Sequence, residues 1–456
     1  MGIFSALNTA VTGLSVQAYS LEQISGNIAN SQTVGYKRTD VSFQDLVNDS
    51  NATRQEAAGV RVESRATNDV QGDIIDTASP TAMAINGDGF FIVGQSDGIS
   101  DGQATFDDLD LYTRRGDFER DAEGYLVNGA GYFLKGLPVN QTTGNVVGTQ
   151  PQLIQVTSDL LPARATTSIA YSANIPAFPF NQQADPTIPN SELLNPVGYA
   201  ADPTTAGVGF VGATDEPRFL DQSISGGAIT AYVASGADAN LQLRWAKTSN
   251  APGAETWNLF YLEDSNATGA APAWRNTGTD FVFGADGNLT APANSQLAIN
   301  GATINGTPLQ NFTIDFGANG LTQFDDNGGL INILELRQNG FPVGEFSSVR
   351  ITDAGRVSAS YTNGETVDLA EVTLVAFNAD NRLEKRDGGA FIQTADSGPP
   401  ILLNGNNIIA SALESSNSEI SEEFTKLIVT QQAYSANTRI ITTADEMFQE
   451  VLNIVR

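Results

Sequence analysis

The chain has 456 residues and carries 23 basic against 52 acidic side chains, a formal charge of −29. This charge argues against nucleic acid or an anionic membrane as the main partner, since both recruit clustered Lys and Arg. Cys and His are absent, which excludes disulfides, thiolate nucleophiles, Cys/His zinc sites and His-dependent triads.

The N-terminal segment 3–28 is predicted to be a helix with one apolar seam. The seam has the heptad spacing that is typical of a coiled coil, and its residues are Leu7, Val11, Leu14, Leu21 and Ile28. The remaining faces carry amides, hydroxyls and a single charge, Glu22. The first basic residue is Lys37 and no long apolar run occurs, so neither a cleaved secretory signal nor a membrane span is expected. Residues 1–35 are assigned to this helical part, and 36–78 to a connecting segment.

The middle of the chain is predicted to be β-structure. Asn-Gly pairs, the strongest short signal for a hairpin, recur through it. Period-two alternation is clear at Leu241, Leu243 and Trp245. Strands are predicted over 89–93, 125–134, 228–234, 240–246, 256–262, 349–351, 356–361 and 372–377.

Composition divides this β region into two domains. Residues 176–203 are rich in Pro, Asn and Ala, and all three Trp lie between them and residue 341. We therefore predict an inserted outer β domain over 176–336, and one discontinuous β domain formed by 79–175 and 337–399. The predicted fold class is α+β, with mainly β outer domains nested between N- and C-terminal α-helices that form a coiled-coil-like inner domain.

Residues 400–456 are predicted to be a connection followed by a helix that begins near residue 418. Its apolar seam also has heptad spacing and shifts near the end, as a stutter does; its residues are Ile420, Leu427, Tyr434, Ile441 and Met447. Two interpretations stay open, a helix hairpin within one chain or packing of both helices against further copies. We favour further copies, because the helices are long and their outward faces are nearly uncharged.

No catalytic, cofactor or metal site is predicted. Asp97, Asp101, Gly102 and Asp108 have the spacing of an EF-hand loop, but Ile99 occupies a ligand position and cannot bind calcium. We favour an acidic surface loop there. Other paired carboxylates fall where hairpins are expected to turn, and Asp with Gly is ordinary turn chemistry. The chain is therefore not expected to be an enzyme.

Motifs at both ends resemble the signatures of bacterial flagellar rod and hook proteins. The stretches 3–14, 27–30 and 33–37 are similar to the N-terminal signature, and 413–417, 431–437 and 440–445 to the C-terminal one. Internal stretches that also match are 112–118, 121–128, 339–344 and 351–355. The motif residues are Asn27, Asn30, Gly35, Tyr36, Gln432, Tyr434, Asn437 and Asp445. The likeness extends to residue 175 and resumes at 337, and the large insert favours hook members over the shorter rod members.

This resemblance implies a structural subunit that polymerises into a curved, flexible hook tube. The tube would act as a universal joint that transmits torque from rod to filament, and would form part of the export channel. The implied partners are further copies of the chain, the distal rod, hook cap and hook–filament junction proteins, and the flagellar export apparatus; no nucleic acid, membrane or cofactor is implied.

The resemblance also implies an extracellular location in the flagellar hook, reached without a cleaved signal peptide. The terminal helices, which cannot bury their seams alone, are expected to be disordered in the monomer and to order on assembly. The alternatives are a distal rod subunit or a hook-associated junction protein of the same family.

Overall fold

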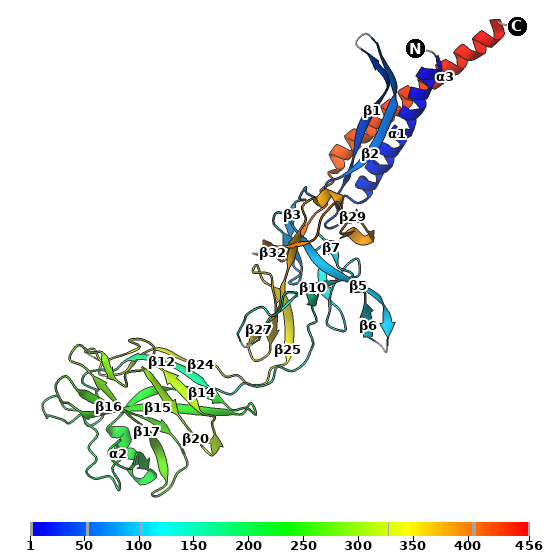
Figure 1. Cartoon of the computed structure of the whole chain (residues 1–456). Helices are drawn as coiled ribbons and strands as arrows, with labels where there is room; N and C mark the ends of the chain where they lie inside the picture. Colours follow the sequence, from blue (N-terminus) through cyan, green and yellow to red (C-terminus); the bar gives the residue numbers. More distant parts are fainter. Residues whose placement is uncertain are drawn as a thin grey trace. The chain divides into compact units, whose positions relative to one another are not determined.

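The structure is a computed structural model that describes residues 3–51, 54–100, 103–141, 143–326, 328–403 and 407–454. It has helices at both ends and strands between them (Figure 1), so the predicted α+β class is confirmed. Asp101 and Gly102 of the EF-hand-like loop lie outside the described residues. The chain divides into two compact units: unit 1 comprises 1–158, 347–360 and 366–456, and unit 2 comprises 159–346 and 361–365. The finer division predicted from composition stays a prediction.

Unit 1 contains the two long helices and most of the short strands. The helices are α1 (Ile3–Ala29) and α3 (Ile420–Ile454). The strands up to residue 158 are β1 (Thr39–Asn51), β2 (Arg54–Ala66), β3 (Ile74–Asp76), β4 (Met83–Ile85), β5 (Phe90–Ser100), β6 (Gln103–Phe106), β7 (Leu111–Thr113), β8 (Phe118–Arg120), β9 (Leu126–Asn128), β10 (Tyr132–Pro138) and β11 (Gln152–Leu153). The later strands are β25 (Phe346–Ile351), β26 (Arg356–Tyr361), β27 (Thr366–Val372), β28 (Leu374–Ala376), β29 (Glu384–Lys385), β30 (Ala390–Ile392), β31 (Ile401–Leu402), β32 (Ile408–Ala410) and β33 (Ala412–Glu414).

The two helices lie side by side and run antiparallel (Figure 1). Gly13 of α1 lies against Asn437 of α3, and Asn27, fourteen positions later, contacts Glu423, fourteen positions earlier. Helix contacts at such spacing keep one face of each helix turned toward the other along their shared length. Both helices begin and end close to the residues predicted from heptad spacing.

Strands β1 and β2 form a long hairpin that packs along α1 (Figure 1). They pair in antiparallel register from Thr39 with Ala66 to Asn51 with Arg54. Phe43 and Leu46 of β1 are about half exposed. Residues 36–78 were predicted to be a connecting segment, and this hairpin was not predicted.

The β part of unit 1 combines strands that come before unit 2 in the sequence with strands that come after it. Its main sheet has the strand order β25-β26-β27-β10-β5-β7-β30-β29. Two short ladders, β3 with β33 and β4 with β32, bring the segment after the hairpin against the segment before α3. Aromatic and aliphatic side chains of both halves form a small core: Phe90, Ile92, Tyr112, Val375, Phe377, Leu383 and Phe391. This pairing fixes the end of α1 close to the start of α3.

Unit 2 is built around two larger sheets that share a core, with the small β20–β21 ladder and α2 beside them. Its elements are β12 (Ser168–Asn174), β13 (Phe210–Gly212), α2 (Glu216–Asp221), β14 (Ile224–Tyr232), β15 (Asp238–Ser249), β16 (Glu255–Leu262), β17 (Pro272–Phe283), β18 (Leu289–Ala291), β19 (Gln296–Ile299), β20 (Thr303–Ile304), β21 (Thr307–Pro308), β22 (Phe312–Asp315), β23 (Leu321–Thr322) and β24 (Asn332–Gln338). One sheet has the order β13-β17-β16-β15-β14, and the other contains β19, β22, β12, β23 and β24. Buried side chains of both sheets pack together, as in other sandwiches. Trp245 joins the two sheets, since its Nε1 donates to the Tyr171 hydroxyl at 3.1 Å.

One Asn-Gly pair shows how the predicted turns form. Asn305 (φ 48°) and Gly306 (φ 81°) connect β20 directly to β21. Positive φ at both central positions is what a tight two-residue hairpin requires, and Asn followed by Gly adopts it with little strain.

Candidate functional site at the base of the terminal helices

Asn27 joins the end of α1 to the hairpin and to the start of α3. Its side chain is buried, with 2 % of the residue exposed. Its Nδ2 donates to the Thr39 carbonyl at 3.0 Å and to Glu423 Oε2 at 3.2 Å. Its Oδ1 accepts from the Thr39 amide at 3.0 Å and the Tyr36 hydroxyl at 3.3 Å. The hydrogen-bonding capacity of the amide is therefore fully used, and the Ser418 hydroxyl donates to the Asn27 carbonyl at 3.1 Å.

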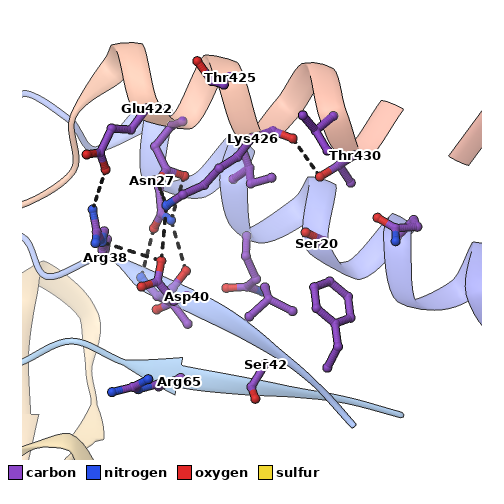
Figure 2. Close-up of a pocket in the computed structure, with 18 of the residues that line it drawn as sticks. Ser20, Asn27, Arg38, Asp40, Ser42, Arg65, Glu422, Thr425, Lys426 and Thr430 are labelled. Carbon is purple, nitrogen blue, oxygen red and sulfur yellow. Dashed lines mark hydrogen bonds and ion pairs between the residues drawn. The ribbon is translucent and has the colours of Figure 1, made fainter. Parts of the chain in front are cut away.

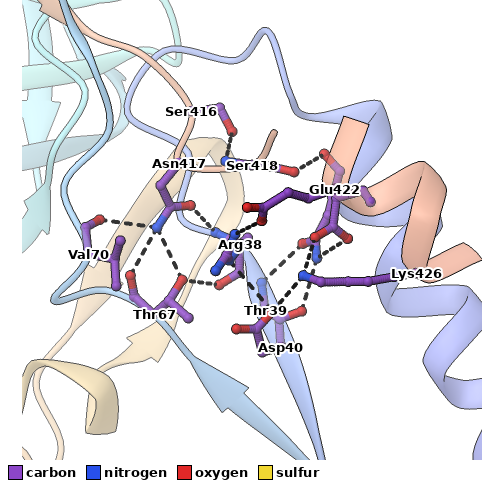
Figure 3. A network of polar contacts seen from close by, with 12 residues as sticks. Arg38, Thr39, Asp40, Thr67, Val70, Ser416, Asn417, Ser418, Glu422 and Lys426 are labelled. Carbon is purple, nitrogen blue, oxygen red and sulfur yellow. Dashed lines mark hydrogen bonds and ion pairs between the residues drawn. The ribbon is translucent and has the colours of Figure 1, made fainter. Parts of the chain in front are cut away.

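Asn417 makes a second junction just before α3 (Figure 3). Its Oδ1 accepts from the Arg38 amide at 2.7 Å. Its Nδ2 lies 3.1 Å from the carbonyl and the hydroxyl of Thr67 and from the Val70 carbonyl. The Asn417 amide donates to the Tyr36 carbonyl at 3.2 Å. One short side chain thus connects the start of β1, the end of β2 and the approach to α3.

Beneath these junctions lies a buried ion network of Lys37, Arg114 and Glu414. Lys37 Nζ lies 2.5 Å from Glu414 Oε1, and Arg114 Nη1 lies 3.2 Å from Glu414 Oε2. Their side chains are at most 2 % exposed. The Gly72 amide also donates to Glu414 at 3.0 Å, and Lys37 donates to the Val70 carbonyl at 2.6 Å. Burial lowers the pKa of Lys37, while Glu414 opposes that shift. Glu414 holds together three segments that are far apart in sequence.

Charged side chains continue along the first turns of α3. Glu423 is fully buried, and Lys426 Nζ lies 2.6 Å from its Oε1 and 3.4 Å from Asp40. Arg38 pairs with Glu422 at 3.2 Å in a partly exposed position. Acidic side chains in a first helical turn interact favourably with the helix dipole.

Tyr36 is enclosed from two sides. Lys385 Nζ lies 4.1 Å from the centre of its ring, a favourable cation–π distance. Burial, and then the charge of Glu423, raises the pKa of the Tyr36 hydroxyl. The hydroxyl therefore stays protonated and can donate to Asn27.

A groove of about 660 Å³ lies between α1, α3 and the hairpin (Figure 2). Its floor and walls carry Ser20, Asn27, Asp40, Lys426 and Thr430, among others. The apolar lining includes the buried Ile24 and two largely exposed side chains, Phe43 (50 %) and Val429 (60 %). This hairpin groove thus has a mixed lining and an open apolar rim.

The structure places the predicted seam residues beside the most buried helix face. Leu7, Leu14, Leu21, Ile28, Leu427 and Ile441 are partly buried, whereas Val11, Ile420, Tyr434 and Met447 are 40–48 % exposed. The buried helix positions are instead Ala10, Val16, Ser20, Ile24 and Asn27 on α1, and Glu423, Thr430 and Ala444 on α3. Val16, Ile24 and several small or polar side chains therefore occupy the buried positions, and the predicted seam is left partly open.

Some of the motif residues make contacts within the chain, and others are exposed on α3. Asn30 Nδ2 donates to the Gly26 carbonyl at 2.9 Å at the end of α1. Gly35 has φ +65°, and a Cβ there would lie 2.8 Å from the backbone of Arg114, so only glycine fits without strain. Asn437 faces Gly13. Gln432 and Asp445, by contrast, are exposed on α3.

The sequence analysis did not single out the buried ion network. Arg114 and Glu414 fall inside stretches that resemble the family, and Lys37 ends another, but nothing local indicates that they meet. One Lys, one Arg and one Glu that are separated by up to 377 positions give no spacing pattern in the sequence.

Among the described helices, none is both long and apolar enough to cross a membrane.

Three segments match known protein families. Residues 7–37 match the family described as "Flagella basal body rod protein". Residues 84–174 match "Flagellar hook protein FlgE/F/G D1 domain", and residues 409–454 match "Flagellar basal body rod FlgEFG protein C-terminal". These segments include most of α1, much of the β part of unit 1 together with β12, and α3.

Two relatives that align along the whole chain are named as flagellar hook proteins. The flagellar hook protein FlgE of Escherichia coli (strain K12) is 28 % identical over 455 residues, covering 98 % of this chain and 100 % of the relative. FlgE of Brucella suis biovar 1 (strain 1330) is 27 % identical over 464 residues, covering 100 % of both chains. The solved structure of Helicobacter pylori flagellar hook protein FlgE2 has a TM-score of 0.49 and 18 % identity, covering 75 % of this chain and 100 % of that one. In these three segments and along its full length, the chain is therefore similar to flagellar hook and rod proteins.

Proposed function

We propose that this chain is the structural, non-enzymatic subunit of the flagellar hook and polymerises into a curved, flexible tube. The proposal is supported by relatives named as hook proteins that align along their whole length. A distal rod subunit or a junction protein is the alternative within the family. We favour the hook because the aligned relatives include a counterpart of unit 2, which spans most of the middle of the chain.

The observation that carries the proposal is the apolar surface left open on α3. Eight large apolar side chains of α3 are 40–68 % exposed: Ile420, Phe424, Ile428, Val429, Tyr434, Ile440, Met447 and Leu452. α1 covers another face. Removing such surface from water is worth about 25 cal/mol per Å². Further copies of the chain are the occupant that fits, because the same exposed apolar side chains are repeated on every subunit.

The proposed polymer contacts are the partly open seam residues. On α1 these are Leu7, Val11, Leu14, Leu21 and Ile28, and on α3 they are Ile420, Leu427, Tyr434, Ile441 and Met447. Helices packed in this way would line the tube, which would form part of the export channel. If the contacts between the outer β parts of neighbouring subunits are few and polar, these parts can slide past one another as the tube bends.

Torque requires a firm connection between the helices and the β part of unit 1. The buried ion network and the two Asn junctions supply one, because breaking a buried ion pair costs several kcal/mol. We therefore propose that this base transmits load from tube to outer surface. The remaining proposed partners are the distal rod, hook cap and hook–filament junction proteins and the export apparatus, at an extracellular location reached without a cleaved signal.

Polymer growth by an α3 variant tests the proposal. Ile428 is 53 % exposed on α3, and a charge there would have to be buried between copies. We expect Ile428→Glu to abolish polymer growth in high salt, measured by light scattering and sedimentation. Leu330→Glu, at an exposed apolar site of unit 2 (62 %), is the matched control and should polymerise normally. Normal growth of Ile428→Glu polymers would contradict the proposal.

A further inference from the structure

Unit 2 contains a buried carboxylate, Glu192, that has among the described residues no positively charged partner and one oxygen without a hydrogen bond. Glu192 is only 4 % exposed. Its Oε1 has a short contact with Asn250 Nδ2, and its buried Oε2 has no hydrogen-bond partner. No Lys or Arg in the described part of the chain forms an ion pair with Glu192. An unpaired buried carboxylate is costly unless another group compensates its charge.

The neighbouring groups add further acceptors instead of donors. Asn250 Nδ2 also lies 3.3 Å from Asn190 Oδ1, so one NH₂ group faces oxygens of two residues. Asn250 Oδ1 is itself buried without a partner. Glu192 Oε1 and Asn190 Oδ1 therefore share a single donor group, and Glu192 Oε2 and Asn250 Oδ1 have no donor within the described part of the chain. Such a surplus of oxygen atoms with one negative charge is the composition of a site for a hard cation.

The protein's own cations are held elsewhere. Lys247, three residues before Asn250, places Nζ 2.7 Å from Glu255 and 2.6 Å from the Ala177 carbonyl. Its main-chain carbonyl accepts from the Leu194 amide, and Asn181 Nδ2 donates to the Glu192 carbonyl at 2.8 Å. These bonds fix the backbone of the 181–194 segment against the end of β15 and hold Glu192 and Asn250 together.

We propose that Glu192, Asn250 and Asn190 bind a calcium ion. Glu192 would supply one or both carboxylate oxygens and the two Asn residues their amide oxygens, after rotation of the Asn250 amide. Amide oxygens and nitrogens are exchanged by such a rotation at no change in shape. Calcium suits mixed carboxylate, amide and water ligands, whereas magnesium demands stricter geometry. With a single carboxylate the site would be weak, with a dissociation constant of about 0.1–1 mM, as in extracellular modules.

Thermal unfolding of the full chain, followed by tryptophan emission, tests the site. All three Trp lie in unit 2, so the emission reports on this unit. Calcium at about 10 mM should raise the melting temperature by roughly 3–10 °C over chelator alone. Salt near 0.15 M would screen loose binding to the acidic surface.

Three variants separate this site from general attraction to an acidic protein. Glu192→Gln should abolish the calcium response, and should be no less stable than the parent chain without calcium, since the new amide can donate to Asn250 Oδ1. Asn250→Asp should tighten calcium binding at least several-fold while lowering stability in chelator. Asp286→Asn, in an exposed turn of the same unit, removes an equal charge and should respond like the parent.

No rise with calcium in the parent chain would overturn the site. A rise that Glu192→Gln retains in full would also overturn it, because the ion would then bind elsewhere. Neither outcome bears on polymer formation, which is measured separately.

Discussion

At the residue scale, the junction of α1, the β1–β2 hairpin and α3 depends on a few polar side chains whose hydrogen-bonding groups nearly all have partners. Asn27 and Asn417 each contact several segments, and Glu414 neutralises part of the charge on two buried cations. Such groups contribute little when all partners are present and are costly when one partner is removed.

The sharpest residue-scale prediction concerns Glu414. Glu414→Gln keeps the shape but leaves Lys37 and Arg114 buried without a counter-charge, so unit 1 should lose about 3–5 kcal/mol of unfolding free energy. Urea unfolding followed by far-UV circular dichroism measures this loss. Glu422→Gln, whose side chain is 54 % exposed beside Arg38, should lose no more than about 1 kcal/mol. Equal losses for the two variants would contradict the importance of the buried network.

Tyr112 predicts a response to alkaline pH. Burial, and then the nearby Asp110, raises the pKa of Tyr112 to about 12. Above pH 10 the unfolded chain releases this proton while the folded chain keeps it, so folding loses stability as pH rises from 10 toward 12. Tyr112→Phe keeps the ring against Phe377, 4.8 Å between centres, and removes the proton. Its unfolding free energy should therefore fall less steeply over this range; parallel curves would count against the buried hydroxyl.

At the scale of elements, α1 and α3 approach closely where their side chains are small. A Cβ on Gly13 would lie 2.9 Å from Asn437 Nδ2, whereas a Cβ on Gly26 would meet nothing within 4 Å. The same substitution therefore has different consequences at two positions of one helix.

Gly26→Ala should stabilise α1 by about 0.5–1 kcal/mol, because alanine is the better helix former. Gly13→Ala should stabilise α1 less than Gly26→Ala does, or should destabilise it, because Asn437 must move to make room for the new methyl group. Melting of the polymer, followed at 222 nm, compares the two. Equal upward shifts would mean that the helices do not pack closely at Gly13.

The elements that the sequence predicted well are those with strong local signals. Heptad spacing predicted α1 and α3, and Asn-Gly predicted the turn at Asn305. The β1–β2 hairpin was missed because its alternation is short, with only Val41 and Phe43 in β1 and Val60 and Val62 in β2. The buried ion network and the Glu192 cluster were missed because their members meet only through the fold, 58 residues apart for Glu192 and Asn250.

At the scale of the whole molecule, unit 2 can be removed at a defined place. The Leu161 amide donates to the Gly344 carbonyl at 2.8 Å, so the two crossing segments lie side by side there. Joining 161 to 344 through a short glycine linker should leave unit 1 folded, with unchanged urea unfolding by circular dichroism and no tryptophan emission. Loss of the unit 1 transition would show that the two units depend on each other.

Electron microscopy of polymers grown from the purified full chain in high salt tests whether the chain is a hook subunit. We expect long, curved tubes from the full chain, and straighter tubes when residues 162–343 are deleted. Straight, rigid tubes from the full chain would favour a rod subunit. A monomer that forms no tubes at any concentration would contradict the proposal that further copies of the chain cover the exposed apolar side chains of α3.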